Sequence, residues 1–238
     1  LEQGKPAFTA FASPEIGVAQ AINAAPYDAV VFEMEHNPYD IQLLRNCMQY
    51  MLNRKQILKL GSPAPAVAPM VRIPANGGEM NQWLAKQALD IGVYGVIWPH
   101  VSTVEEARNA VAACRYPRPK TAQYYEPAGQ RGDSPKNAAP YWGITQQEYY
   151  GVADVWPLNP KGEVLCVIMC EEVRAIKNLP KMLEQVPGIG VVLLGEGEGE
   201  AAAAEIQRTL DKVAAHGAAA AALKRGFLEH IGADDAEV

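Results

Sequence analysis

Five apolar runs in this sequence each end at a polar residue of a kind that often takes part in catalysis. The runs end at His36, Arg72, His100, Glu171 and the acidic, glycine-rich turn 195–200. Segments with helical spacing separate them. Parallel β/α barrels gather their catalytic residues at the C-terminal ends of their strands. The pattern therefore predicts an α/β protein with a (β/α)8 TIM-barrel fold.

Six segments have strand composition, and five segments with apolar residues three or four apart are expected as helices. The helix 102–115 begins with Ser102 and Thr103 before two glutamates, a typical signature of a helix N-terminus. Gly92 is the expected C-cap of the helix 79–92. The expected strands are 6–12, 29–35, 68–72, 94–99, 164–170 and 191–195, and the expected helices are 14–25, 41–52, 79–92, 102–115 and 171–186.

Two stretches interrupt this alternation. Residues 116–163 are rich in proline, glycine and tyrosine, and we expect a long inserted loop that either covers the mouth of a site or contacts another subunit. After residue 198 the chain has alanine runs at 201–204 and 218–222 and no clear seventh or eighth strand. We expect residues to be missing or misidentified between about 198 and 223. The whole chain, 1–238, is expected as one domain.

Charge and cysteine content narrow the class of protein. The net charge is −6 and Lys and Arg form no stripe, which argues against nucleic acid as the main partner. The apolar runs are too short to span a bilayer and no signal peptide is recognisable, so no membrane partner is expected. The four cysteines show no CxxC spacing, and reduced thiols fit a cytoplasmic enzyme.

Two acidic residues at strand ends are candidate metal ligands. Glu171 follows the apolar run 164–170, where a carboxylate must be solvated, paired or bound to metal. Glu198 lies in a turn where glycines such as Gly197 let backbone N–H groups approach a bound anion. Two carboxylates with water suit Mg²⁺ or Mn²⁺, whereas the alternative for the turn is an acidic surface loop.

Arg72 and two histidines complete the candidate site. The planar guanidinium of Arg72 binds either a carboxylate or oxyanion of a substrate, or an acidic neighbour such as Glu171. His36 follows Glu33 by three residues, and a histidine oriented by a carboxylate transfers protons near neutral pH. His100 either lines the site or packs.

Short motifs at these positions resemble the HpcH/HpaI aldolase family over roughly residues 5–198, in order. FEMEH is similar to the family's D-x-E-H, MVRIP to its M-V-R-x-P, and VIMCEE to the strand that bears the metal glutamate. Further similar segments follow the family order. The matching segments are 32–36, 70–74, 89–101, 105–107, 115–117, 129–132, 167–172 and 187–195.

The resemblance implies a barrel of the phosphoenolpyruvate/pyruvate type, usually a homo-oligomer such as a hexamer or trimer. It also implies a class II aldolase that reversibly cleaves a 4-hydroxy-2-oxo acid to pyruvate and an aldehyde through a metal-bound pyruvate enolate. The metal would be Mg²⁺, Mn²⁺ or Co²⁺. By resemblance Glu171 and Glu198 hold the metal, Arg72 stabilises the enolate oxygen and His36 with Glu33 serves the acid–base step. In macrophomate synthase-like members the histidine at the position of His100 contacts the second substrate.

Two other functions stay open. One is a citramalate- or malyl-CoA-type lyase of the same barrel group, although no nucleotide-binding surface is recognisable. The other is a non-catalytic barrel used in binding or assembly. Three departures from the family pattern favour it, namely Glu33 for Asp, Met169 for Gln and Glu198 for Asp. No lysine lies at a clear strand end, which argues against a Schiff-base mechanism. The sequence does not identify the aldehyde.

Overall fold

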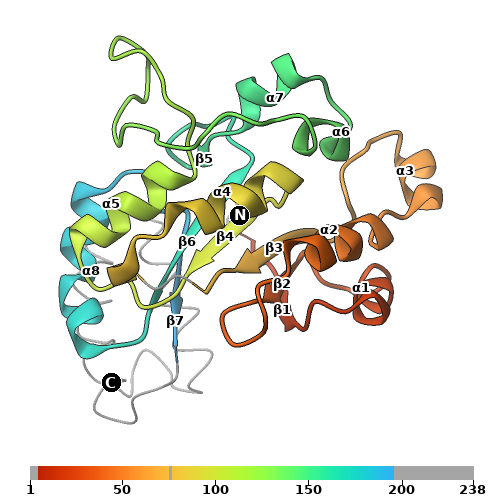
Figure 1. Cartoon of the computed structure of the whole chain (residues 1–238), viewed down its shortest axis with the longest axis horizontal. Helices are drawn as coiled ribbons and strands as arrows, with labels where there is room; N and C mark the ends of the chain where they lie inside the picture. The colour runs from red at the N-terminus through yellow and green to blue at the C-terminus, as the bar shows by residue number, and fades with distance from the viewer. Residues whose placement is uncertain (1–4, 75–76, 196–238) are drawn as a thin grey trace.

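The computed structural model describes residues 5–74 and 77–195, which form a parallel sheet covered by helices (Figure 1). Six strands pair in chain order, all in parallel, and all six lie within predicted segments. The short strand β5 (Val155–Trp156), which was not predicted, pairs with the start of β6. The six are β1 (Thr9–Ala12), β2 (Ala29–Glu33), β3 (Ala68–Arg72), β4 (Gly95–Trp98), β6 (Val164–Cys170) and β7 (Val191–Leu194).

The five predicted helices are all present, and neighbouring ones contact each other along one side of the sheet. At the predicted start of α5, Thr103 and Glu106 form a capping box, with Thr103 N donating to Glu106 Oε2 at 3.0 Å. Gly92 ends α4 with a φ of 103°, which a residue with a Cβ rarely adopts. The helices are α1 (Ile16–Ile22), α2 (Ile41–Tyr50), α4 (Gln82–Ile91), α5 (Val104–Ala113) and α8 (Val173–Gln185).

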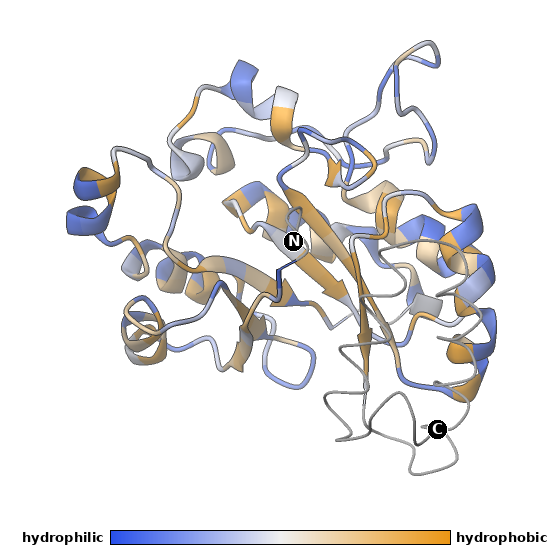
Figure 2. Cartoon of the chain, turned by 180° about the vertical axis from the view of Figure 1, so that it is seen from behind, coloured by the Kyte–Doolittle hydropathy of each residue, from blue (hydrophilic) through white to orange (hydrophobic). Residues whose placement is uncertain are grey.

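The two faces of the sheet bury different side chains. One face packs against the helices and forms the larger core. The opposite face, which we call the inner face, is turned toward the viewer in Figure 2, where the strands are coloured as hydrophobic. A second cluster, Val31, Met70, Ile97, Val167 and Met169, occupies it. Side chains alternate between faces along a strand, so the residues two positions after Val31, Met70 and Met169 also point to the inner face.

The segment 116–163 is not the continuous loop that was expected. It contains α6 (Ala138–Trp142), α7 (Gln146–Val152) and β5. The Trp142 ring stacks on Tyr94, just before β4, with centroids 4.4 Å apart, and its Nε1 donates to Gly92 O at 2.8 Å. These helices therefore pack at the amino-terminal end of β4. They do not cover the carboxyl ends of the strands, where a barrel's site lies.

A buried ion pair anchors the same segment to α5. The Arg115 side chain is 1% exposed and donates from Nε to Asp154 Oδ1, whose side chain is 0% exposed, at 2.6 Å. Arg115 also donates to three main-chain carbonyls, of Tyr124, Tyr125 and Pro127. Two short elements that were not predicted, α3 (Arg54–Leu60) and the 3₁₀ turn η1 (Gly77–Glu79), complete the described chain.

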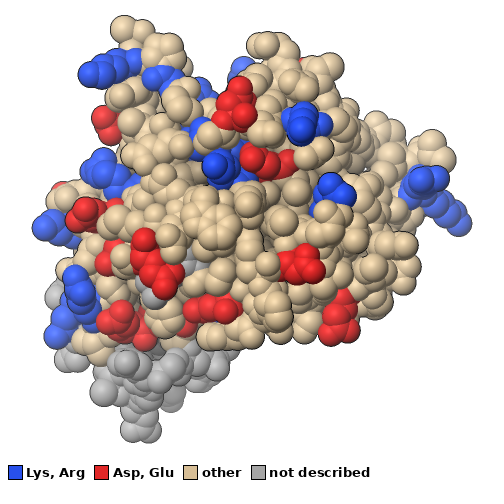
Figure 3. Space-filling view, viewed as in Figure 1, with Lys and Arg blue, Asp and Glu red and all other residues tan. Residues whose placement is uncertain are grey.

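Charged side chains of both signs are interspersed over the face shown in Figure 3, without a continuous basic stripe. None of the helices described is long and apolar enough to cross a membrane. The tail after residue 198, with the expectations attached to it, lies outside the described residues.

Candidate active site

Arg72 is held on the inner face by two carboxylates. The register of β2 and β3 pairs Glu33 with Arg72, and Arg72 Nε donates to Glu33 Oε2 at 2.5 Å. The Nη2 atom contacts the same oxygen, and Nη1 lies 3.0 Å from Glu35 Oε2. Nη1 also lies 3.5 Å from the sulfur of Met169, two residues before Glu171 on β6. The sequence analysis named Glu171 as an example of an acidic neighbour for Arg72, but Arg72 pairs with Glu33 and Glu35 instead.

Glu35 is the central residue of the site, and the sequence reasoning gave it no role. Its side chain is only 9% exposed. One carboxylate oxygen lies near Arg72 and 3.6 Å from His36 Nε2, and the other lies 3.4 Å from His100 Nε2. Oε2 is buried and makes no hydrogen bond of good geometry among the described residues. The signal that could have revealed it was already present, because Glu35 is the second glutamate of the EMEH motif and directly precedes His36.

His36 is placed differently from the expectation. Glu33 Oε1 accepts hydrogen bonds from the main-chain N–H groups of Glu35 and His36, at 2.8 and 3.1 Å. The side chain of Glu33 therefore bonds to the backbone of His36 and shapes the turn after β2. The His36 ring is 73% exposed, and the carboxylate beside it is Glu35.

His100 links the two sides of the site. It has a φ of 53°, an uncommon conformation for a residue with a side chain, and its N–H donates to Glu171 Oε2 at 3.1 Å. Its ring nitrogens lie 3.4 Å from Glu171 Oε2 and 3.4 Å from Glu35 Oε1. Of the two alternatives for His100, the structure favours a position in the site over packing, because the ring lies between two carboxylates and is 44% exposed.

Glu171, the candidate metal ligand, directly follows the last residue of β6. Its side chain is on the inner face and 19% exposed. A Cβ added at Gly195 would lie 2.7 Å from Glu171 Cγ, so the end of β7 leaves room for this carboxylate. Within 5–74 and 77–195, no group of three or more His, Cys, Asp or Glu residues is arranged to hold a metal ion. Other ligands would have to come from water, substrate or Glu198, and Glu198 and Gly197 lie outside the described residues.

The side chain of the preceding residue, Cys170, lies on the helix side of β6, opposite the inner face. Burial, and to a smaller extent the charge of Glu171, raises the pKa of the Cys170 thiol to about 12. The free thiol packs in the helix-side core.

Comparison with known proteins identifies the family. The sequence model of the HpcH/HpaI aldolase/citrate lyase family matches residues 8–222. The chain belongs to this family. The resemblance drawn from the motifs is thereby confirmed, and with it membership of a family of carbon–carbon lyases. Enzymes of this family are in general class II aldolases that depend on a divalent metal.

Two relatives and one solved structure illustrate the similarity. A 2-dehydro-3,6-dideoxy-6-sulfogluconate aldolase of Pseudomonas putida is 28% identical over 82% of this chain and 64% of its own length. A hydroxypyruvate/pyruvate aldolase of Cupriavidus necator is 32% identical over 76% of this chain and 55% of its own. This chain thus spans less than two thirds of either relative.

The crystal structure of a family protein from Burkholderia cenocepacia superposes with a TM-score of 0.66 at 22% identity, over 88% of this chain and 77% of that one. The similarity shows that the chain shares the fold of this family protein, and the parallel sheet with its helices confirms the predicted α/β class and is consistent with a TIM barrel.

Proposed function

We propose that the protein is a metal-dependent class II aldolase that reversibly cleaves a 4-hydroxy-2-oxo acid to pyruvate and an aldehyde. One observation carries the proposal. The Arg72 guanidinium is fixed at the carboxyl end of β3, and its Nη1 lies 3.5 Å from Met169 on the strand that leads to Glu171. A fixed positive charge beside a candidate cation ligand suits a substrate that becomes an enolate.

The reaction needs a site for negative charge and a route for one proton. In cleavage, a base takes the proton from the C4 hydroxyl, the C3–C4 bond breaks, and the electron pair moves into the pyruvate enolate, which is then protonated at C3. Arg72 would stabilise the enolate oxygen, where charge develops. A divalent cation held by Glu171 and Glu198 would supply Lewis-acid stabilisation of the same charge.

His36 is the best candidate for the proton transfer. Its ring is exposed to solvent and lies beside Glu35, so it can exchange protons with water. His100 would contact the aldehyde from the other side of Glu35. Pyruvate as the enolate component agrees with the name of the Cupriavidus relative, a hydroxypyruvate/pyruvate aldolase. A cytoplasmic homo-oligomer, a hexamer or trimer, remains part of the proposal.

The test is aldol addition of pyruvate to an aldehyde with Mg²⁺ or Mn²⁺ present, comparing Arg72→Lys with wild type. Lysine keeps the charge but loses the planar fork that Glu33 and Glu35 hold. We expect kcat to fall about 10²–10³-fold, as for the loss of one charge-stabilising donor. Arg54→Lys, at the exposed start of α3, is the matched control and should retain full activity.

A non-catalytic barrel is the second candidate, because both carboxylates around Arg72 already neutralise its charge. It predicts no turnover in the wild type with any metal. It also predicts that Arg72→Lys lowers only the melting temperature.

A further inference from the structure

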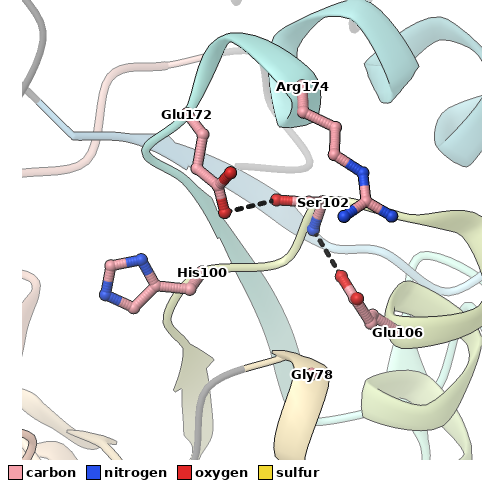
Figure 4. Close-up of a pocket in the computed structure, with 6 residues that line it drawn as sticks. All are labelled: Gly78, His100, Ser102, Glu106, Glu172 and Arg174. Atoms are coloured by element: carbon pink, nitrogen blue, oxygen red, sulfur yellow. Dashed lines mark hydrogen bonds between the residues drawn. The ribbon is translucent and has the colours of Figure 1, made fainter.

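Pockets lie at both ends of the strands in the described part of the chain. The pocket in Figure 4 contains His100 and two glutamates, and it belongs to the candidate site at the carboxyl ends. Another pocket, with a volume of about 490 Å³, lies between α2 and α6, where α4 contacts both helices. Ile91, the last residue of α4 before β4, lines it. This α2–α6 pocket is therefore at the amino-terminal end of the sheet, away from the candidate site.

The α2–α6 pocket carries positive charge. Arg45 of α2 lines it together with Lys136, which lies two residues before α6. Within the part of the chain that the structure describes, no Asp or Glu lines the pocket, and neither cation makes an ion pair. The whole chain has a net charge of −6, so the pocket reverses the sign of its surroundings. Both cations are available to an anionic ligand.

Three carboxamides lie beside these cations. Asn46, Gln49 and Asn137 line the pocket. Gln49 is three residues after Asn46 and four after Arg45, so one face of α2 presents all three side chains. A carboxamide both donates and accepts hydrogen bonds, which suits the polar edge of a heterocyclic ring.

The remaining surface of the pocket is apolar and held in place. Leu52 and Ile91 line it, together with Tyr141, which is 8% exposed. The Tyr141 hydroxyl donates to Met48 O at 3.5 Å, and a Cβ added at Gly92 would lie 2.7 Å from Tyr141 Cδ1. Tyr141 is therefore packed between α2 and the end of α4. The pocket is formed without a ligand, as binding sites for small molecules usually are.

We propose that the α2–α6 pocket binds a purine nucleoside monophosphate. A phosphate monoester carries a charge of about −1.5 to −2 at neutral pH, which matches two cations. Arginine binds phosphate through its planar fork and lysine as a point charge. The base would lie against Leu52 and Ile91 with its polar edge toward the carboxamides. Because the pocket is at the other end of the strands from Arg72, this site is independent of the proposed function.

The experiment is titration calorimetry of the full chain with AMP, adenosine and inorganic phosphate. AMP combines the two parts of the ligand, whereas adenosine lacks the phosphate and inorganic phosphate lacks the base. We expect AMP to bind, and each of the other two to bind at least about 10-fold more weakly, since each loses the contacts of one part. Adenosine or inorganic phosphate binding as tightly as AMP would overturn the inference, and so would a wild type that does not bind AMP.

Variants of the two cations locate the bound AMP. Lys136→Gln and Arg45→Gln change exposed side chains and should each weaken AMP binding about 10- to 100-fold, the usual size for a hydrogen bond to a charged group. Lys136→Arg should retain most of the affinity. Unchanged AMP affinity in both glutamine variants would remove the phosphate from this pocket.

Two controls test where the AMP binds. Lys181→Gln removes an exposed cation on α8 and has the same net charge as Lys136→Gln. It should bind AMP as the wild type does, and an equal loss in both variants would show unspecific attraction by charge. Arg72→Lys should also bind AMP normally. Weaker binding in that variant would place AMP at the carboxyl ends of the strands and contradict the inference.

Discussion

Glu35 Oε2 lies 3.0 Å from Arg72 Nη1, while the other oxygen of Glu35 faces His100 at 3.4 Å. One buried carboxylate thus contacts the group proposed to bind the enolate and the group proposed to contact the aldehyde. The two would be positioned together, so a change at Glu35 should affect both halves of the reaction.

Glu35→Gln removes the charge that holds Arg72 and keeps the shape of the side chain. We expect kcat for aldol addition to fall about 10- to 100-fold, the size of effect that follows a small misplacement of a catalytic group. Glu105→Gln, an exposed carboxylate in the first turn of α5, is the control and should leave kcat nearly unchanged.

A double-mutant cycle separates positioning from a general loss of stability. If Glu35 acts through Arg72, the effect of Glu35→Gln should largely disappear in an Arg72→Lys background. Additive effects in the cycle, with equal losses of melting temperature, would assign Glu35 a purely structural role.

Gly195→Ala tests the space around Glu171. The new Cβ would lie 2.7 Å from Glu171 Cγ, a distance at which one of the two groups has to move. We expect weaker Mn²⁺ binding, measured by titration calorimetry, in a protein that still folds. Gly151→Ala in α7 is the matched control, because nothing lies within 4 Å of its Cβ. Equal Mn²⁺ affinity in both variants would argue against Glu171 as a ligand.

Arg115→Ala tests the anchor of the segment 116–163. It leaves Asp154, whose side chain is 0% exposed, without its main partner, and breaking a buried ion pair in this way costs about 3–5 kcal/mol. Urea denaturation should show a loss of this size. Arg118→Ala removes the more exposed partner of Asp154, 26% exposed, and should cost about 1 kcal/mol or less. A similar loss of unfolding free energy in both variants would contradict the assignment of Arg115 as the main partner of Asp154.

The strands could be predicted because each is a short apolar run bounded by recognisable signals, and the main helices because their apolar residues recur three or four positions apart. The elements that were missed are short, and their signals are local. β5 has two residues, and α6 has five with a proline among them, so neither shows a period. α7 did carry a signal, the Thr145–Glu148 capping box, and α3 is bounded by the N-cap Asn53 and the C-cap Gly61.

In the site, the residues at strand ends were found because strand direction alone places them. Arg72 and Glu171 are of this kind, with side-chain alternation directing both to the inner face. The partners were harder to predict, because they depend on the turn after β2. In that turn the Glu33 side chain accepts hydrogen bonds from the backbone N–H groups of Glu35 and His36. The carboxylate beside the His36 ring is therefore that of Glu35 and not that of Glu33. No period in the sequence encodes that turn.

The central claim is that this site forms the enolate of pyruvate with the help of a divalent metal. The most direct test is the exchange of the C3 protons of pyruvate for deuterium, followed by proton NMR without any aldehyde. We expect the wild type to catalyse exchange with Mg²⁺ or Mn²⁺, to lose it with excess chelator, and to regain it when metal is restored. Exchange no faster than in buffer with the metal alone, in a protein that is folded, would contradict the account.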